Sequence, residues 1–475
     1  MRKNRLYAIG LGLVLGLASP CIPSFAETGA QLPKLEAPSE TEPPAETETS
    51  AETESPAETE APAETESPAE TEAPAETETS AETKAPSETE TQAETEAPSA
   101  PQAEGPGQGM SEADGGTISH TGEAPKDYSQ IGPGMGMPSG GSSSQPSNQE
   151  FTSMTVENPV VQVAEKYSYE QMEADIQELQ KRYGTAHMQV TVIGTSADGR
   201  KIYDIMAGNP NAGKHVLIQG AIHAREYANP LLMMKQIEDI LAFYDTGFYH
   251  GKRISDLLNQ AAIHFVPMAN PDGVALSQFG LDALHSQQLK QTVQTAYTSD
   301  LAAGRTTQEF SRYLERWKSN ARGVDLNHNF DALWTNTSSN WMLPSFSGYK
   351  GLTPVSEPES QVLVNLMNSN YPWAAVLNYH SMGKVIYWDI EGNKEKEKSQ
   401  QLAQLMSAAT GGYQMLYSGG GGGFKDWVQL KENPVPSITV ETGKMDCPMP
   451  VSEFESIWAE NRTGWAVVTE FVLSY

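Results

Sequence analysis

Cysteine is almost absent from this 475-residue sequence, which contains only Cys21 and Cys447. Cys21 precedes the expected cleavage point of an export signal, so the mature chain keeps Cys447 alone. One cysteine cannot form an intramolecular disulfide, and an exported protein without disulfides must be stabilised by a large core. The scarcity of cysteine therefore excludes a small, disulfide-stapled scaffold.

Long apolar runs are also rare. One run, from Leu6 to Leu17, follows the basic stretch Arg2–Arg5 and leads to the small-x-small triplet Ser24-Phe25-Ala26. This order predicts a secretory signal peptide over residues 1–26. The alternatives are an uncleaved anchor and a lipid at Cys21, the latter disfavoured because a proline precedes that cysteine. No other run approaches the roughly 18–20 apolar residues that span a bilayer, so we expect no membrane span after cleavage.

Positive charge is scarce, with 31 Lys and Arg against 61 Asp and Glu. Residues 27–104 alone contain 22 glutamates and two lysines, in variants of Pro-Ala-Glu-Thr-Glu. Such a segment has little to bury and repels itself, so it is predicted to be a disordered spacer. Residues 105–155 are rich in Gly, Ser and Met and are predicted to be a flexible linker. Because the rest of the chain is also acidic, nucleic acid is not an expected partner.

Residues 156–475 have the pattern of a folded domain. Apolar residues at Met172, Ile176, Leu179 and Tyr183 are spaced by four, three and four positions, which predicts an amphipathic helix over 169–183. Short apolar strands and helix-length segments then alternate, which predicts one α/β domain with a mostly buried sheet flanked by helices. The expected strands are 188–193, 201–206, 215–219, 262–267, 374–379 and 437–440, and a second helix is expected at 229–243.

The candidate site begins at Gly220-Ala221-Ile222-His223-Ala224-Arg225-Glu226, directly after the expected strand 215–219. Open α/β sheets bind ligands at the carboxyl ends of their strands. A histidine and a glutamate three residues apart are a weak signal on their own, because surface loops contain such pairs as well. A metal site would need a third ligand and a base elsewhere in the chain.

The remaining histidines fit structural or surface positions. His215 and His264 lie beside or within apolar strands, and we expect structural roles for both. His250 and His285 lie in polar stretches and are expected at the surface, while His120 belongs to the linker.

Five blocks, in this order along the chain, resemble those of the zinc metallocarboxypeptidases, the carboxypeptidase A-like peptidases. The resemblance covers residues 166–475 and implies a mixed β-sheet flanked by helices. The blocks are Gly220–Glu226, Asn270-Pro271-Asp272-Gly273, Arg322-Gly323-Val324-Asp325-Leu326-Asn327, Tyr379-His380-Ser381 and Thr439-Val440-Glu441-Thr442.

The resemblance implies that His223, Glu226 and His380 bind one Zn²⁺ ion. Catalytic zinc takes three protein ligands, leaves a fourth position for water and lowers the pKa of that water toward about 7. Glu441 matches the general base, which takes the water proton and delivers it to the leaving amine. Asp325 matches the residue that accepts a hydrogen bond from His223 and fixes its tautomer.

Three further residues have expected roles around the substrate. Arg322 matches the position that stabilises the developing oxyanion, with Arg316 and Arg312 as competitors. Asn327 is expected to contact the substrate carboxylate, and Tyr417 resembles the mobile tyrosine that closes over substrate.

His328 departs from the family pattern, in which arginine grips the terminal carboxylate of a peptide. Histidine is shorter and only partly charged at neutral pH. The stretches 316–327, 383–388 and 423–427 are similar to a bacterial branch, the γ-D-glutamyl-L-diamino acid endopeptidases, which cut stem peptides of the cell wall.

We therefore expect an exported zinc peptidase that hydrolyses γ-D-glutamyl-diamino acid bonds in peptidoglycan stem peptides. Its substrate would be a peptide or muropeptide, and the protein would be secreted or associated with the cell wall. The first alternative is a metallocarboxypeptidase that removes C-terminal residues from ordinary peptides. The second is a non-catalytic module that binds the cell wall.

Overall fold

The computed structural model describes residues 149–337, 339, 341–418 and 420–475. The expected signal peptide (1–26), the acidic spacer (27–104), His120 and the linker as far as residue 148 lie outside the described residues. Phe151, in the stretch expected as linker, is buried in the core, so the folded chain includes the last residues of that stretch. No helix in the described ranges is long and apolar enough to cross a membrane.

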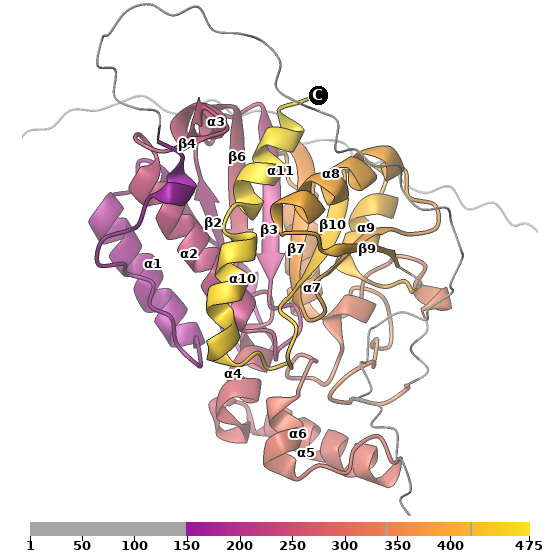
Figure 1. Cartoon of the computed structure of the whole chain (residues 1–475). Coiled ribbons are helices and arrows are strands. Elements are labelled where there is room, and N and C mark those ends of the chain that lie inside the picture. Colours follow the sequence, from indigo (N-terminus) through magenta and orange to yellow (C-terminus); the bar gives the residue numbers. More distant parts are fainter. Residues whose placement is uncertain (1–148, 338, 340, 419) are drawn as a thin grey trace, which may run out of the picture. The chain divides into compact units, whose positions relative to one another are not determined.

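An eight-stranded mixed sheet forms the centre of the folded region (Figure 1), in the order β1-β2-β6-β3-β7-β10-β8-β9. The central strands β6, β3, β7 and β10 are parallel, and β9 is parallel to β8. Antiparallel pairs join β1 to β2, β2 to β6 and β10 to β8. The strands are β1 Met188–Thr195, β2 Lys201–Ala207, β3 Lys214–Gly220, β6 Ala261–Val266, β7 Trp373–Ser381, β8 Val385–Asp389, β9 Gln414–Tyr417 and β10 Ser437–Thr442, with a separate pair β4 Phe248–Tyr249 and β5 Lys252–Arg253.

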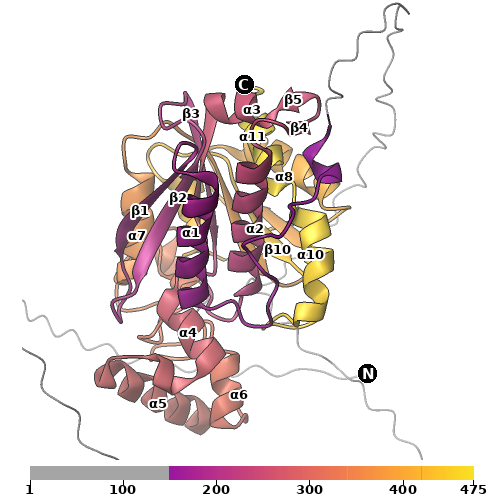
Figure 2. The same cartoon turned by 90° about the vertical axis from the view of Figure 1, so that its left-hand side faces the viewer.

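Helices cover both faces of this sheet (Figures 1 and 2). On β3, Val216 and Ile218 pack into the core formed with α1, α2, α8, α10 and α11, while Leu217 packs into the core formed with α7 and α9. The alternation follows from the period of two in a strand, and both faces are apolar because both are covered. The helices are α1 Tyr169–Tyr183, α2 Ala228–Phe243, α3 Ile254–Gln260, α4 Pro271–Phe279, α5 Gln287–Ala302, α6 Phe310–Glu315, α7 Pro358–Met367, α8 Lys396–Ala409, α9 Phe424–Leu430, α10 Phe454–Asn461 and α11 Gly464–Val472, with short 3₁₀ turns at Phe151–Ser153, Leu281–Ala283, Leu326–His328, Trp334–Asn336 and Val451–Glu453.

The α/β architecture with a buried mixed sheet is as predicted. Helix α1 has the predicted bounds, and α2 and the predicted strands agree within a few residues. Strands β8 and β9 were not predicted. They are short and lie at one edge of the sheet, where half-buried residues replace the continuous apolar run of a central strand.

A smaller helical core lies beyond the carboxyl ends of the central strands (Figures 1 and 2), where α5 and α6 pack near α4. Trp317 is fully buried there, and the Tyr313 hydroxyl donates to the buried Asp300 carboxylate at 2.7 Å. This core fixes the start of the segment that runs from Trp317 to the 3₁₀ turn at Leu326–His328.

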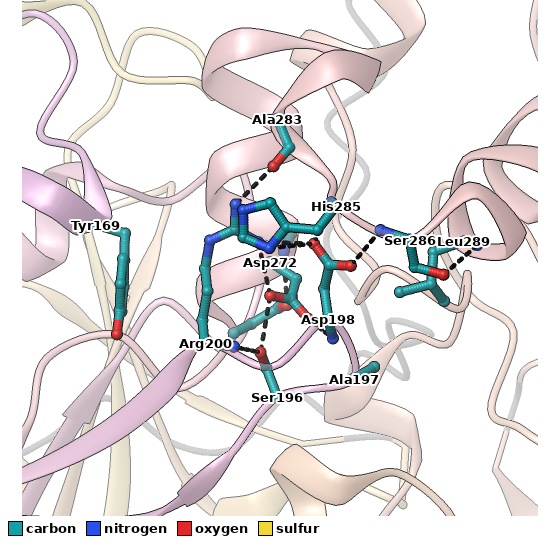
Figure 3. Close-up of polar contacts among 12 residues, drawn as sticks. Tyr169, Ser196, Ala197, Asp198, Arg200, Asp272, Ala283, His285, Ser286 and Leu289 are labelled. Atoms are coloured by element: carbon teal, nitrogen blue, oxygen red, sulfur yellow. Dashed lines mark hydrogen bonds and ion pairs between the residues drawn. The ribbon is translucent and has the colours of Figure 1, made fainter.

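A buried ionic network ties the β1–β2 turn to α4 (Figure 3). Arg200 contacts Asp272 at 2.9 Å and Asp198 at 3.1 Å, and the Ser196 hydroxyl donates to Asp272 at 2.7 Å. Arg200 also donates to the Ala283 carbonyl at 2.6 Å. Asp272 belongs to one of the five blocks, and here it stabilises the fold through its contacts with Ser196, Asp198 and Arg200.

Glu359, in the first turn of α7, extends this polar region. Its fully buried carboxylate accepts hydrogen bonds from the Ala197 amide at 3.0 Å and the Asn320 side chain at 3.0 Å. Burial and the nearby charge of Asp272 nevertheless raise the pKa of Glu359 from 4.5 to about 7. The folded protein therefore holds a proton on Glu359 over a pH range in which the unfolded chain has lost it.

This difference predicts a pH-dependent effect of Glu359→Gln on stability. The favourable contribution of protonated Glu359 is complete below pH 4.5 and is lost as the pH rises toward 7. The free energy of unfolding of the variant minus that of the wild type should thus rise by about 3 kcal/mol across this interval. Urea titrations at several pH values measure it. Glu432→Gln, at an exposed glutamate, is the control, and an equally flat profile for both variants would contradict the prediction.

Candidate metal centre and substrate pocket

The register of three parallel strands brings the candidate site together. Gly220, at the end of β3, pairs with Tyr379 of β7, so the loop that contains His223 and Glu226 emerges beside the end of β7. On the other side of β7, Glu441 of β10 pairs with His380. Residues more than two hundred positions apart are therefore neighbours at one end of the sheet.

The donor atoms of His223, Glu226 and His380 converge, and all three side chains are buried. The His223 Nδ1 lies 2.7 Å from a Glu226 oxygen and 3.2 Å from the His380 Nδ1, which is itself 3.2 Å from the other Glu226 oxygen. Ligands about 2.0–2.1 Å from a tetrahedral zinc ion lie roughly 3.3 Å apart. The donor set therefore fits a zinc ion, and two of the three separations match this spacing.

The charges of the cluster are suited to a cation. Burial alone would raise the pKa of Glu226, but the two imidazoles hold it well below its usual value, so the carboxylate stays ionised. Burial lowers the pKa of His380, which leaves a neutral ring with a lone pair to offer. Burial and Lys318 oppose protonation of His223, yet Glu226 and Asp325 raise its pKa to about 9. Zinc binding at neutral pH must then release a proton from His223.

Asp325 lies where it can orient His223. One carboxylate oxygen is 3.3 Å from the His223 Nε2, and the other accepts the Gly348 amide at 2.9 Å. Although burial would raise the pKa of Asp325, the charges of His328, His223 and Lys318 hold it well below its usual value. An ionised Asp325 favours the tautomer with the proton on Nε2, which leaves Nδ1 free to ligate.

A pocket opens beside this cluster and contains the other expected substrate residues. Its lining includes His223, Glu441, Asn327, His328, Tyr387 and Lys425. The Asn327 side-chain oxygen accepts the Phe424 amide at 3.1 Å, so its NH₂ group remains to contact a ligand.

Glycines that precede α9, namely Gly420, Gly421 and Gly423, form one wall of the pocket. Gly422 has φ +83°, and a Cβ there would lie 2.7 Å from the His328 carbonyl oxygen. Its own carbonyl accepts the Phe330 amide at 2.9 Å. Glycine is required at this position because both the backbone conformation and the close approach exclude a side chain.

Tyr417 lies near this pocket without lining it. It is the last residue of β9 and is 52% exposed, while the following residues Ser418 and Gly420 line the pocket. The structure thus places Tyr417 near the rim, compatible with the expected mobile residue.

Arg322 is not among the residues that line this pocket. Its side chain is 48% exposed, and its guanidinium lies 3.6 Å from the Glu357 carboxylate. Lys318 is instead 5% exposed, its carbonyl accepts the Ala224 amide of the metal loop at 3.0 Å, and its charge opposes protonation of His223. Of the competing arginines, Arg316 pairs with Asp446 at 3.0 Å.

Four other histidines of the described region occupy structural or surface positions. His264 lies between Asp204 at 2.7 Å and His215 at 2.8 Å, and both rings are buried. The side chains of His250 and His285 are 66% and 73% exposed.

Three pocket or site residues were missed by reasoning from the sequence. They are Lys318, Tyr387 and Lys425. Each lies inside a stretch that resembles the bacterial branch, which was the only signal available. A single sequence does not show which side chain of such a stretch points inward.

Comparison with known proteins supports the fold and the chemistry. Residues 172–464 match the zinc carboxypeptidase family. The chain is 34% identical over 300 residues to γ-D-glutamyl-L-diamino acid endopeptidase 1 of Lysinibacillus sphaericus, covering 62% of this chain and 70% of that protein. It is 25% identical over 258 residues to carboxypeptidase O of Bos taurus, covering 51% and 59%. The crystal structure of thrombin-activatable fibrinolysis inhibitor is similar with a TM-score of 0.51 at 18% identity, covering 68% and 79%, and supports the fold alone.

We expect Asp325→Asn to weaken zinc binding by about 10- to 100-fold, because an amide no longer fixes the His223 tautomer. Competition with a chromogenic chelator measures the affinity, and circular dichroism tests that the fold is retained. Asp331→Asn, at an exposed aspartate nearby, is the matched control. Unchanged affinity in the Asp325 variant would contradict the orienting role.

Proposed function

The chain belongs to the zinc carboxypeptidase family, and from this premise we propose an exported zinc peptidase that hydrolyses γ-D-glutamyl-diamino acid bonds in peptidoglycan stem peptides. The observation that carries the proposal is a pocket in which Glu441 and His223 meet Asn327 and His328. The similarity to an endopeptidase named for this bond, over 70% of its length, supports the choice of substrate.

Hydrolysis needs an activated water and a proton carrier. Zinc held by His223, Glu226 and His380 would supply a Lewis acid that makes water acidic and polarises the scissile carbonyl. Glu441 lines the same pocket beside His380 and takes the proton from water, then delivers it to the leaving amine.

Lys318 is our candidate for stabilising negative charge on the scissile carbonyl. It is buried, it is bonded through its backbone to the metal loop, and its charge acts on both histidines of the cluster. A fixed cation in an enclosed site stabilises developing charge strongly. Arg322, expected from the sequence in this role, faces Glu357 instead and is the rival to be tested.

His328 favours a substrate other than an ordinary peptide terminus. A planar guanidinium grips a carboxylate with two parallel hydrogen bonds, and an imidazole offers at most one donor in that direction. With Asn327 as its neighbour in the pocket, His328 would bind a substrate end less tightly than arginine does. Removal of C-terminal residues remains the second candidate, because Asn327 still offers its NH₂ group there.

The parts of the chain outside the described residues suit a cell-wall substrate. A signal peptide over 1–26 would export the protein, and the spacer (27–104) and the linker as far as residue 148 would let the peptidase domain reach substrate at a distance. Extended chain of this kind covers about 3.1 Å per residue. We infer a secreted or wall-associated protein that acts on muropeptides. The metal-ligand set and Glu441 argue against a purely binding module.

A substrate panel tests this proposal. We expect the zinc-loaded full chain to cut a muropeptide after γ-D-glutamate and to release little from ordinary peptides, as read by mass spectrometry. Glu441→Gln should retain zinc while its turnover falls by about 100- to 10,000-fold. Release of single C-terminal residues with no cut after γ-D-glutamate would establish the carboxypeptidase instead. Muropeptide binding without cleavage of either class would favour the binding module.

Paired variants distinguish the two cations. Lys318→Met should lower kcat by about 100- to 1,000-fold, as loss of an oxyanion donor does, while Arg322→Met keeps most activity. Zinc content and thermal unfolding of both variants show whether the fold and the metal are retained. If Arg322→Met lowers kcat more than Lys318→Met does, Arg322 is the residue that stabilises charge on the scissile carbonyl.

A further inference from the structure

Three buried polar side chains lie beside the metal cluster, and the proposed chemistry assigns them no role. They are Asn229 in the first turn of α2, Ser381 at the end of β7 and Thr442 at the end of β10. Asn229 and Thr442 are fully buried, and Ser381 is 6% exposed. The described lining of the pocket includes none of the three, so they are not placed to contact substrate.

The three side chains form a closed ring of hydrogen bonds, and their chemistry fixes its direction. The Asn229 NH₂ group can only donate, and it donates to the Ser381 hydroxyl at 3.2 Å. The Asn229 side-chain oxygen can only accept, and it accepts the Thr442 hydroxyl at 2.8 Å. The Ser381 and Thr442 oxygens are 2.9 Å apart, and because Thr442 has used its one proton, Ser381 donates to Thr442. Each group in the Asn229–Ser381–Thr442 ring therefore donates once and accepts once.

Two members of the ring also hold the zinc ligand Glu226 through their backbones. The Ser381 amide donates to one Glu226 carboxylate oxygen at 3.2 Å. The Asn229 amide donates to the Glu226 carbonyl oxygen at 3.1 Å. A movement of either residue would therefore displace this ligand.

The bond between Ser381 and Thr442 fixes β7 against β10 where both strands end. In the parallel register, the two residues pair directly after the pair of His380 and Glu441. Because side chains alternate along a strand, the two hydroxyls lie on the face opposite to the ligand and the base. The Thr442 oxygen is also 3.1 Å from the His380 carbonyl oxygen, which brings the ring against the backbone of the second ligand.

Stability alone explains this ring poorly. Apolar side chains cover the same face of β7 and β10 elsewhere, as Leu377, Tyr379, Ile438 and Val440 do. Apolar contacts tolerate small displacements, whereas a fully satisfied buried hydrogen-bond network permits one arrangement of the elements that it joins. The ring joins the three elements that carry the ligands and the base.

We propose that the Asn229–Ser381–Thr442 ring positions the site, holding Glu226 and His380 at the separation at which they bind zinc and Glu441 beside them. The effect on Glu441 rests on the proposed function, and the effect on the metal does not depend on the substrate. Opening the ring should therefore lower both zinc affinity and kcat. KM should change little, because the ring does not line the pocket.

Thr442→Val tests the proposal, since it removes the hydroxyl at nearly constant volume. We expect zinc affinity of the full chain, measured by competition with a chromogenic chelator, to fall by about 10- to 100-fold. We expect kcat of the zinc-loaded variant on a muropeptide to fall by a similar factor. Thr442→Ser keeps a hydroxyl and should restore both. The matched control is Thr469→Val, which removes a fully buried hydroxyl of α11 that donates to the Trp465 carbonyl at 2.7 Å.

If Thr442→Val lowers only the thermal unfolding temperature, as Thr469→Val is expected to do, the proposal is overturned. If Thr442→Val does not fold, Ser381→Ala opens the same ring, and unchanged zinc affinity in that variant would overturn the proposal equally.

A double variant tests whether the three groups act as one ring. Either single substitution breaks the whole ring, so Ser381→Ala combined with Thr442→Val should bind zinc about as tightly as the weaker single variant. Losses that multiply would show independent contributions and overturn the ring. If the wild type cuts neither muropeptides nor ordinary peptides, the proposed function is wrong, and the zinc affinities still judge this inference.

Discussion

The parallel register of β3, β7 and β10 is the constraint on which the site depends. Because Gly220 pairs with Tyr379 and His380 pairs with Glu441, the metal loop, the last ligand and the base emerge side by side. A shift of β10 by one residue would turn Glu441 to the opposite face, since side chains alternate along a strand. The apolar residues that cover both faces of these strands therefore stabilise the catalytic geometry as well as the fold.

Charge balance is the second theme of the structure. At the cluster, Glu226 and Asp325 remain ionised although they are buried, because His328, the cluster histidines and Lys318 offset their charge. Away from the cluster, Glu359 lacks such an offset, and burial raises its pKa to about 7. Buried carboxylates in one domain thus differ in ionisation because their neighbours differ, and only the first kind is suited to bind a cation.

Much of the fold could be predicted, and the reasons are local. The central strands are continuous apolar runs, and α1 has a clear helical period. The local order of apolar residues is therefore enough to predict them. Strands β8 and β9 were not predicted because they lie near the edge of the sheet, are short and are only half buried. The site was harder to predict, because the identity of a loop residue does not show where its side chain points. Arg322 matched a sequence block, yet Lys318 is the buried cation of this segment, while Arg322 is half exposed and faces Glu357.

The sequence by itself determined the chemistry that this protein can offer. It contains two imidazoles and a carboxylate in blocks typical of metal binding, and a further carboxylate at the end of a later strand. It also has histidine at position 328, where the family pattern has arginine. These follow from residue identity and spacing, which need no coordinates. Only the tertiary structure decided which of those groups meet. Contact between His223, His380 and Glu441 depends on strand register, and the position of Lys425 and Asp426 beside Asn327 depends on how the glycine run packs against His328. Such long-range packing is a property of the whole core, so no single stretch encodes it.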